Sequence, residues 1–221
     1  MATSGTTSFD LTIEEIIAES YERCGLYVRS GYDLKTSRRS LNLLFAEWAN
    51  RGLNLWTIEQ RTKTLTAGTS SYDLDADLVD ILSAVITEAS DSTVDRKIER
   101  ISRAEYLHIS KKSTSASPTQ FYIERSITPK LYVYATPDAA DTFKYYALTR
   151  IQDAGSYSGN AEVPFRFLPC VVAGLAYYIA MKKAPDRLQL LKQVYEDEWQ
   201  RASAEDSTRS SIKIVPNIGV R

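Results

Sequence analysis

The sequence contains few of the residues that carry most enzymatic and metal chemistry. In 221 residues it has a single histidine, His108, and two cysteines, Cys24 and Cys170. Neither their number nor their spacing indicates a disulfide framework or a metal site. We interpret both cysteines as buried thiols of a reducing compartment and His108 as a surface or partly packed residue, and we expect no cofactor and no metal.

Motifs for phosphate binding and nucleophilic catalysis are also missing, because no GxSxG, GxGxxG or Walker loop is present. Cys170 lies among apolar residues, which raise the pKa of a thiol and make it unreactive. Two facing carboxylates would support glycoside hydrolysis. The candidates by residue type also fit solvated helix faces: Glu14, Glu15, Glu47, Glu196, Asp197 and Glu198. We therefore predict that the chain is not an enzyme, with a tail-associated peptidoglycan hydrolase as the alternative.

The chain lacks an excess of either charge, with 27 Lys and Arg against 28 Asp and Glu. No global field would draw it to nucleic acid or to an anionic membrane. One local basic stripe, formed by Lys35, Arg38, Arg39 and Arg51, is a candidate for DNA or partner contact, and a local DNA-binding module is a further alternative. The N-terminus has no signal-peptide pattern, and the uncharged run from Phe167 to Met181 is shorter than a membrane span. We expect a protein that folds in a cytoplasm without a membrane partner.

Four helices are predicted from apolar periodicity and end signals. The first follows a capping box of Thr12 and Glu15 and ends before Gly25. The second begins after Asp33 as N-cap and ends at Arg51. A third helix, apolar on every face, runs to Lys183 and must be covered all round. Pro185 then opens the fourth helix, which pairs with the third in antiparallel fashion across a short turn.

The middle of the chain predicts strands. Residues 53–74 indicate a hairpin that turns at Ala67 and Gly68, and residues 80–87 indicate a more buried strand. Ser102 and Glu105 form a second capping box, which predicts a short helix packed on the sheet. Three further strand-like runs, TQFYIER, KLYVYA and DTFKYYALTR, suggest an antiparallel meander, in which tyrosines would form cross-strand pairs.

These segments predict an α+β fold in which the N- and C-terminal segments form a helical core interrupted by an inserted antiparallel β-rich lobe. We divide the chain into a helical body of residues 9–52 and 163–206, a β-rich insertion of residues 53–162 and an extended C-terminal tail, residues 207–221. Apolar residues alternate along this C-terminal extension. It can fold back on its own domain, add a strand to another subunit or insert into a groove of another subunit.

The order and wording of several segments resemble the head-to-tail adaptor (connector) proteins of short-tailed bacteriophages, the tail-tubular-protein-A-like or tail accessory family. The resemblance extends from about Leu11 to Asp206. It rests on IEEIIAESYERCGL, SRRSLNLLFAEWANRGLNLWTIE, ISRAEYLHI, PTQFYIER, LYVYATPD, YYALTRIQDAG and VPFRFLPCVVAGLAYYIAMKKAPDR.

The resemblance implies a structural virion protein at the head-tail junction, assembled in the host cytoplasm. Such proteins form a ring of twelve copies beneath the portal protein, extend the channel for DNA ejection and offer a platform to the downstream tail nozzle or tube protein. Double-stranded DNA would pass through without sequence-specific contact. The resemblance places portal binding in the C-terminal extension, at Ile212, Lys213, Ile214, Val215, Pro216, Ile218 and Val220.

Overall fold

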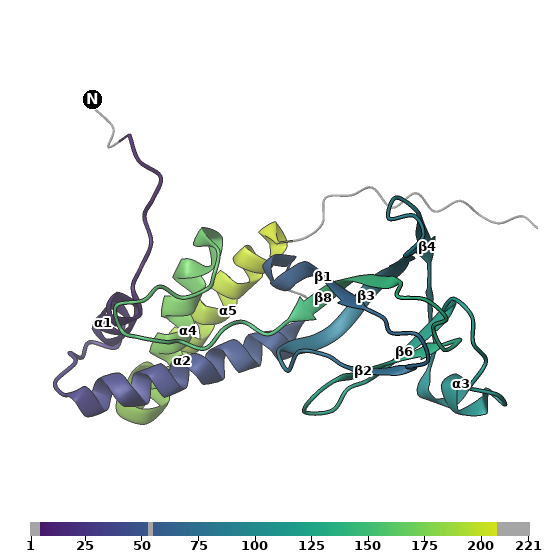
Figure 1. Ribbon diagram of the computed structural model, residues 1–221. Helices are drawn as coiled ribbons and strands as arrows, with labels where there is room; N and C mark the ends of the chain where they lie inside the picture. Colours follow the sequence, from purple (N-terminus) through teal and green to yellow (C-terminus); the bar gives the residue numbers. More distant parts are fainter. Residues whose placement is uncertain (1–4, 53–54, 207–221) are drawn as a thin grey trace, which may run out of the picture. The chain divides into compact units, whose positions relative to one another are not determined.

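The computed structural model, which describes residues 5–52 and 55–206, confirms the α+β fold (Figure 1). The chain divides into two compact units. Among the described residues, 5–40 and 164–206 form one, here called the helical unit, and those within 41–163 form the other, the β unit. Helix α2, Gly31–Arg51, contributes residues to both. Each unit is described by itself.

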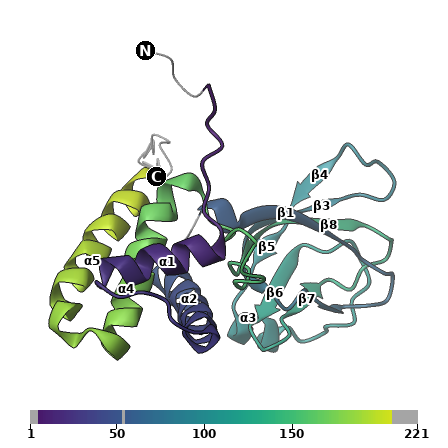
Figure 2. The same ribbon diagram turned by 90° about the vertical axis from the view of Figure 1, so that its left-hand side faces the viewer.

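The helical unit contains α1 (Ile13–Arg23), the beginning of α2, α4 (Leu168–Lys183) and α5 (Leu188–Glu205). Short 3-10 turns precede α4, at Phe165–Phe167, and α5, at Pro185–Arg187. Helices α4 and α5 lie side by side in antiparallel fashion (Figure 2). The predicted helix pair with its short, proline-initiated turn is therefore confirmed.

Helix α4 is the centre of the helical unit, as its uniform apolarity predicts. Its residues from Cys170 to Ala176 are all buried, and Cys24, the C-cap of α1, is buried as well. With the preceding turn, the helical stretch Phe165–Lys183 has 19 residues, longer than we expect from the uncharged run alone. By length and composition it is a candidate membrane span, but 61% of its apolar 18-residue stretch is buried inside the protein, as is typical of a core helix.

Helix α2 begins earlier than the sequence predicts. Its first residue is Gly31, and the Ser30 hydroxyl accepts a 3.3 Å hydrogen bond from the Asp33 backbone N–H. Asp33 therefore lies inside the first turn instead of capping it. Its carboxylate accepts a bond from the Arg29 N–H and pairs with Lys183 at the end of α4. The sequence predicts Asp33 as the N-cap because of its side chain, but serine is also a favourable N-cap residue, and Ser30 lies three residues earlier.

The β unit contains two four-stranded sheets. After a 3-10 turn at Leu55–Thr57, the first sheet has the order β1-β8-β3-β4 and the second has the order β2-β7-β6-β5. Their bounds are β1 Ile58–Thr64, β2 Ser71–Asp73, β3 Leu78–Thr87, β4 Asp95–Lys97, β5 Glu99–Arg100, β6 Gln120–Glu124, β7 Lys130–Tyr134 and β8 Thr142–Thr149. All pairs are antiparallel except β5 with β6.

Inward side chains of both sheets form one apolar core, in which the rings of Phe121 and Phe143 meet edge to face at 5.4 Å. The short helix α3, Arg103–His108, forms with its predicted capping box. Its Tyr106 ring packs on Tyr122 and Tyr132, which are directly opposite each other on β6 and β7. The predicted packing of this helix on a sheet and the cross-strand tyrosine pair are both confirmed.

Two predicted strand pairings are wrong for the same reason. Strands β1 and β2 do not form a hairpin, and β8 does not extend a meander with β6 and β7, because the chain crosses between the sheets at both connections. The crossings are bonded to each other: the Leu65 N–H donates to the Asp141 carbonyl and the Gly68 N–H to the Pro137 carbonyl, each at 2.8 Å. Turn residues mark where a chain bends but not which strand it joins.

Candidate docking surfaces

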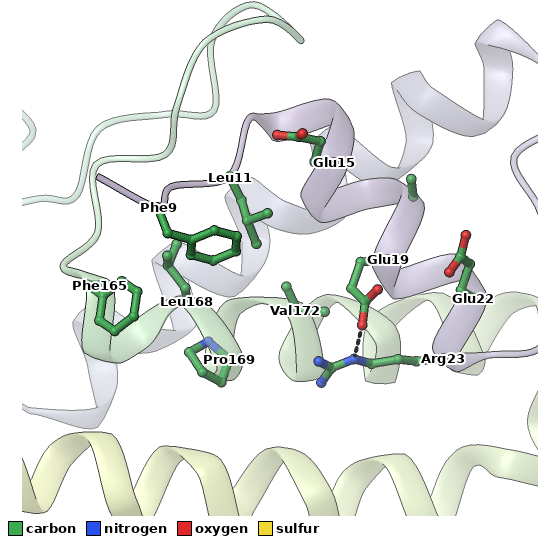
Figure 3. Close-up of a pocket in the computed structure, with 11 residues that line it drawn as sticks. Phe9, Leu11, Glu15, Glu19, Glu22, Arg23, Phe165, Leu168, Pro169 and Val172 are labelled. Carbon is green, nitrogen blue, oxygen red and sulfur yellow. Dashed lines mark hydrogen bonds and ion pairs between the residues drawn. The ribbon is translucent and has the colours of Figure 1, made fainter. Parts of the chain in front are cut away.

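One hollow of the helical unit is an apolar groove of about 450 Å³ (Figure 3). It lies between α1 and the start of α4. Two aromatic rings stand at one end, where Phe9 and Phe165 meet edge to face at 6.3 Å while 66% and 68% exposed. The lining residues are Phe9, Leu11, Glu15, Ala18, Glu19, Glu22, Arg23, Phe165, Leu168, Pro169 and Val172.

The α1 wall of the groove is fixed by its capping box. The Thr12 N–H donates to the Glu15 carboxylate at 2.8 Å, and the Glu15 N–H donates to the Thr12 hydroxyl at 3.3 Å. The backbone hydrogen bond from Thr12 is the main cause that lowers the pKa of Glu15, and the side-chain hydrogen bond from Thr12 lowers it further. The helix ends at Arg23, and Gly25 follows its C-cap with φ of +70°, where an added Cβ would lie 2.7 Å from the Arg187 guanidinium. Glycine alone fits this backbone and this contact without strain.

The groove walls are held together by polar contacts between helices. The buried Ser20 hydroxyl lies 2.6 Å from the Ile16 carbonyl in its own helix and 3.1 Å from the Val172 carbonyl of α4. One turn further on, the Cys24 thiol donates to the Ala176 carbonyl at 3.3 Å. Burial raises the pKa of this thiol, so it stays protonated as a donor. The contacts hold α1 on α4 and leave the groove open beside the N-terminal turn of α4.

The rim of the groove is acidic. Figure 3 shows Glu15, Glu19 and Glu22 along α1, with Arg23 near its end. Arg23 pairs with Glu19 at 3.0 Å, one helical turn apart. Such an exposed pair adds little stability, so its main effect is to set the charge of the rim. With three carboxylates and one guanidinium, the rim favours a partner that carries positive charge.

The base of the C-terminal extension lies next to this groove. Arg166, which immediately follows Phe165, forms an ion pair with the buried carboxylate of Asp206, the last described residue. Phe167 packs edge to face on Trp199 of α5 at 6.0 Å. The portal-binding residues predicted from the resemblance lie outside the described residues: Ile212, Lys213, Ile214, Val215, Pro216, Ile218 and Val220.

The predicted basic stripe separates into two groups. Lys35, Arg38 and Arg39 lie within a little more than one turn of α2, in the helical unit. Arg51 is twelve residues beyond Arg39, which rotates it by about 120° around an ideal helix, and it pairs with Glu47. The structure therefore brings the first three together in the helical unit, while Arg51 belongs to the β unit.

Sequence reasoning missed Lys182, which joins this basic group. Its ammonium group donates to the Ser40 hydroxyl at 2.5 Å. Burial, then the nearby charges of Arg39 and Lys183, lower the pKa of Lys182. Lys183 has its own partners, because it pairs with Asp33 and lies 5.1 Å from the centre of the Tyr21 ring. Lys182 therefore adds to the positive charge around Arg39.

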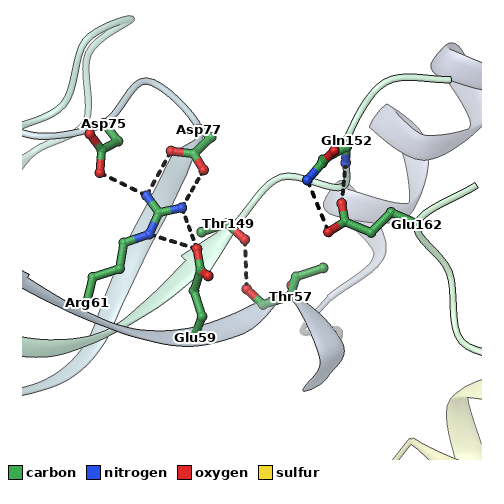
Figure 4. A network of polar contacts seen from close by, with 8 residues as sticks. All are labelled: Thr57, Glu59, Arg61, Asp75, Asp77, Thr149, Gln152 and Glu162. Atoms are coloured by element: carbon green, nitrogen blue, oxygen red, sulfur yellow. Dashed lines mark hydrogen bonds and ion pairs between the residues drawn. The ribbon is translucent and has the colours of Figure 1, made fainter. Parts of the chain in front are cut away.

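A second, polar hollow of about 240 Å³ lies in the β unit (Figure 4). Arg61 dominates it, with both terminal nitrogens bonded to Asp77 at 2.9 and 2.5 Å and further bonds to Asp75 and Glu59. The bonds to Arg61 lower the pKa of Asp77 and keep it ionised. Through Asp75 and Asp77, Arg61 joins β1 to the β2–β3 connection, while Glu59 lies on β1 itself.

The other chemical candidates are placed separately. His108 is exposed on α3, as predicted. Of the hydrolase candidates, Glu47 pairs with Arg51 and Glu198 with Arg201, while Glu15 caps α1. Among residues 5–52 and 55–206, no group of three or more His, Cys, Asp or Glu side chains is placed to hold a metal ion.

Comparison with known proteins supports a structural role. A search of curated proteins gave no match. A family profile described as SU10 adaptor protein matches residues 14–216, from the first turn of α1 through Pro216 of the extension. The match includes the groove residues from Glu15 onward, the whole β unit and the base of the extension. The chain therefore belongs to the SU10 adaptor protein family, which consists of structural bacteriophage proteins of the head-tail junction.

Proposed function

We propose that this protein forms a head-to-tail adaptor ring, a dodecamer, beneath the portal protein, where it extends the DNA channel and supports the downstream tail nozzle or tube protein. The observation that carries this proposal is the family match over residues 14–216. It spans nearly the whole chain and continues past the last described helix, so the beginning of the extension belongs to the family pattern.

The proposal assigns a role to each part of the chain. The helical body, residues 9–52 and 163–206, builds the ring, and the β-rich insertion, residues 53–162, supplies further subunit and tail contacts. The extension, residues 207–221, docks on the portal through its alternating apolar residues. The ion pair between Arg166 and Asp206 supports this assignment, because it anchors the last residue before the extension to the start of α4.

Portal docking is tested by mass measurement of the purified protein, alone and mixed with portal rings. We expect the wild-type chain to bind as a multiple of its own mass. A variant that ends at Asp206 retains the ion pair between Asp206 and Arg166. It should therefore fold, but it should not bind the portal. A second variant keeps the length and replaces Ile212, Ile214, Ile218 and Val220 with serine. Portal binding by both variants would refute docking through the extension.

The basic group of α2 is proposed to contact DNA phosphates or a partner protein, together with Arg51 at the far end of the helix. Its charge is concentrated at Lys35, Arg38 and Arg39, and Lys182 adds to it. Each phosphate contact contributes about 0.9 to the slope of log affinity against log salt. We expect the double variant Arg38→Gln, Arg39→Gln to reduce that slope by about 2. Lys192→Gln, at an exposed position of α5, is the control. If the double variant and the control have equal salt-dependence slopes, DNA contact at α2 is excluded.

A further inference from the structure

The groove between α1 and α4 is suited to a particular kind of segment. Its inner surface is apolar, formed by Leu11, Leu168 and Val172 with the exposed rings of Phe9 and Phe165 at one end. Large apolar side chains that remain exposed together mark a binding surface. The rim is acidic, so the matching segment is apolar with positive charges and without negative ones.

The C-terminal extension has this composition. Its fifteen residues, Ser207 to Arg221, contain no aspartate or glutamate. Their charged side chains are all positive, and their large apolar residues, apart from Val215, follow an alternating pattern in which one side of an extended segment can face a surface. The charged and apolar residues are Arg209, Lys213 and Arg221, and Ile212, Ile214, Val215, Ile218 and Val220.

The extension also begins in the right place. Asp206 is held by Arg166, and the neighbouring residue Phe165 forms one end of the groove. Fifteen extended residues reach about 50 Å at roughly 3.3 Å each. Helix α1, with eleven residues, is about 16 Å long at 1.5 Å per residue. The extension is therefore long enough to pass Phe165 and follow the whole groove.

We propose that in the free protein the α1/α4 groove holds the C-terminal extension of the same chain, with isoleucine and valine side chains on its apolar surface and the lysine and arginines at its acidic rim. Attachment at Asp206 favours the same chain over a second copy, because a short tether raises the effective concentration into the millimolar range. This inference goes beyond the proposed function, since it concerns the protein before it meets a partner. A portal that binds the extension must first displace it from the groove.

The test uses the full chain with a spin label at Ser211→Cys, because Cys24 and Cys170 are buried and react slowly. Contact broadens the amide NMR signals of α1, and chemical reduction of the label restores them. We expect strong broadening along residues 13–23. A mixture of isotope-labelled chains without the spin label and unlabelled chains with it reports contact between copies. Broadening in that mixture equal to that in the single chain would assign the groove to a second copy and overturn the proposal.

Two charge-reversal variants complete the test. Glu22→Lys places a cation on the exposed rim, where it repels the extension, and Asp197→Lys makes the same change on the exposed face of α5. We expect Glu22→Lys to remove most of the broadening and Asp197→Lys to leave it unchanged, with both variants melting near the wild-type temperature. No broadening in the wild-type chain, or equal broadening in both variants, would overturn the proposal. Neither result depends on portal binding, which the truncated variant tests separately.

Discussion

Replacement of Phe143 by alanine should destabilise the β unit selectively. Phe143 is fully buried and contacts the rings of Phe121 and Tyr145, at 5.4 and 5.3 Å between centroids. Loss of a buried phenylalanine side chain costs about 3–5 kcal/mol, a value that includes the cavity it leaves. Since whole proteins are stable by only about 5–15 kcal/mol, this loss is a large fraction of the total.

Thermal unfolding followed by circular dichroism measures the effect. For a chain of this size a loss of 1 kcal/mol lowers the melting temperature by about 2–4 °C, so Phe143→Ala should lower it by about 6–20 °C. Tyr146→Ala is the matched control, because Tyr146 is on the same strand but is 49% exposed. It should cost less than about 1 kcal/mol.

Hydrogen exchange then locates the damage. We expect Phe143→Ala to accelerate exchange in β3, β6 and β8 more than in α1 and α4, because Phe143 belongs to the core of the β unit. Equal losses of melting temperature in Phe143→Ala and Tyr146→Ala would show that the inward and outward faces of β8 are wrongly assigned. Equal acceleration in both units would show that the two units unfold together.

Three further changes test the helical unit. Gly174→Leu forces a large side chain into the buried stretch of α4, and we expect a loss of about 1–3 kcal/mol even after the gain in helix propensity, with an unchanged melting temperature contradicting its core position. Glu15→Ala should destabilise the protein at neutral pH, because it removes the carboxylate of the capping box. In urea unfolding, the difference in unfolding free energy between this variant and wild type should narrow as the pH falls through the pKa of Glu15, which lies below 4.5. Lys183→Met should also destabilise it, because it removes the partner of Asp33. The difference in melting temperature between Lys183→Met and wild type should narrow at a pH below the lowered pKa of Asp33 and at a pH above the raised pKa of Lys183, which lies beyond 10.5. A difference that stays constant across pH would refute the pairing of Lys183 with Asp33.

The elements that the sequence predicts best are those fixed by local interactions. Both capping boxes form as expected, because the side chain and backbone groups that they join are three residues apart. Helix α4 is also evident from sequence, since a helix without a polar face must be surrounded. The start of α2 was misplaced because Ser30 and Asp33 both suit an N-cap, and the choice between them depends on Lys183, which is distant in sequence.

Strand pairing depends on contacts that no local pattern contains. The turn at Ala67 and Gly68 is present, yet it carries the chain to the other sheet. Leu65, just before this turn, is fully buried. Tyr72, just after the turn, accepts a hydrogen bond on its hydroxyl from the Thr66 N–H on the other side of the turn. In the sequence, the signal against a simple hairpin was a large apolar residue, Leu65, directly beside a turn, because hairpin ends are usually solvated.

The groove could not be predicted for a related reason. Phe9 and Phe165 are far apart in sequence, and Glu15, Glu19 and Glu22 have the pattern of an ordinary solvated helix face. Only the packing of α1 on α4 turns this face into a rim around an apolar surface. The net charge of −1 also conceals this separation, because it is the sum over an acidic rim and an extension whose charged side chains are all positive. In a nearly neutral chain, the separation of charge between segments therefore says more about which surfaces meet than the total does.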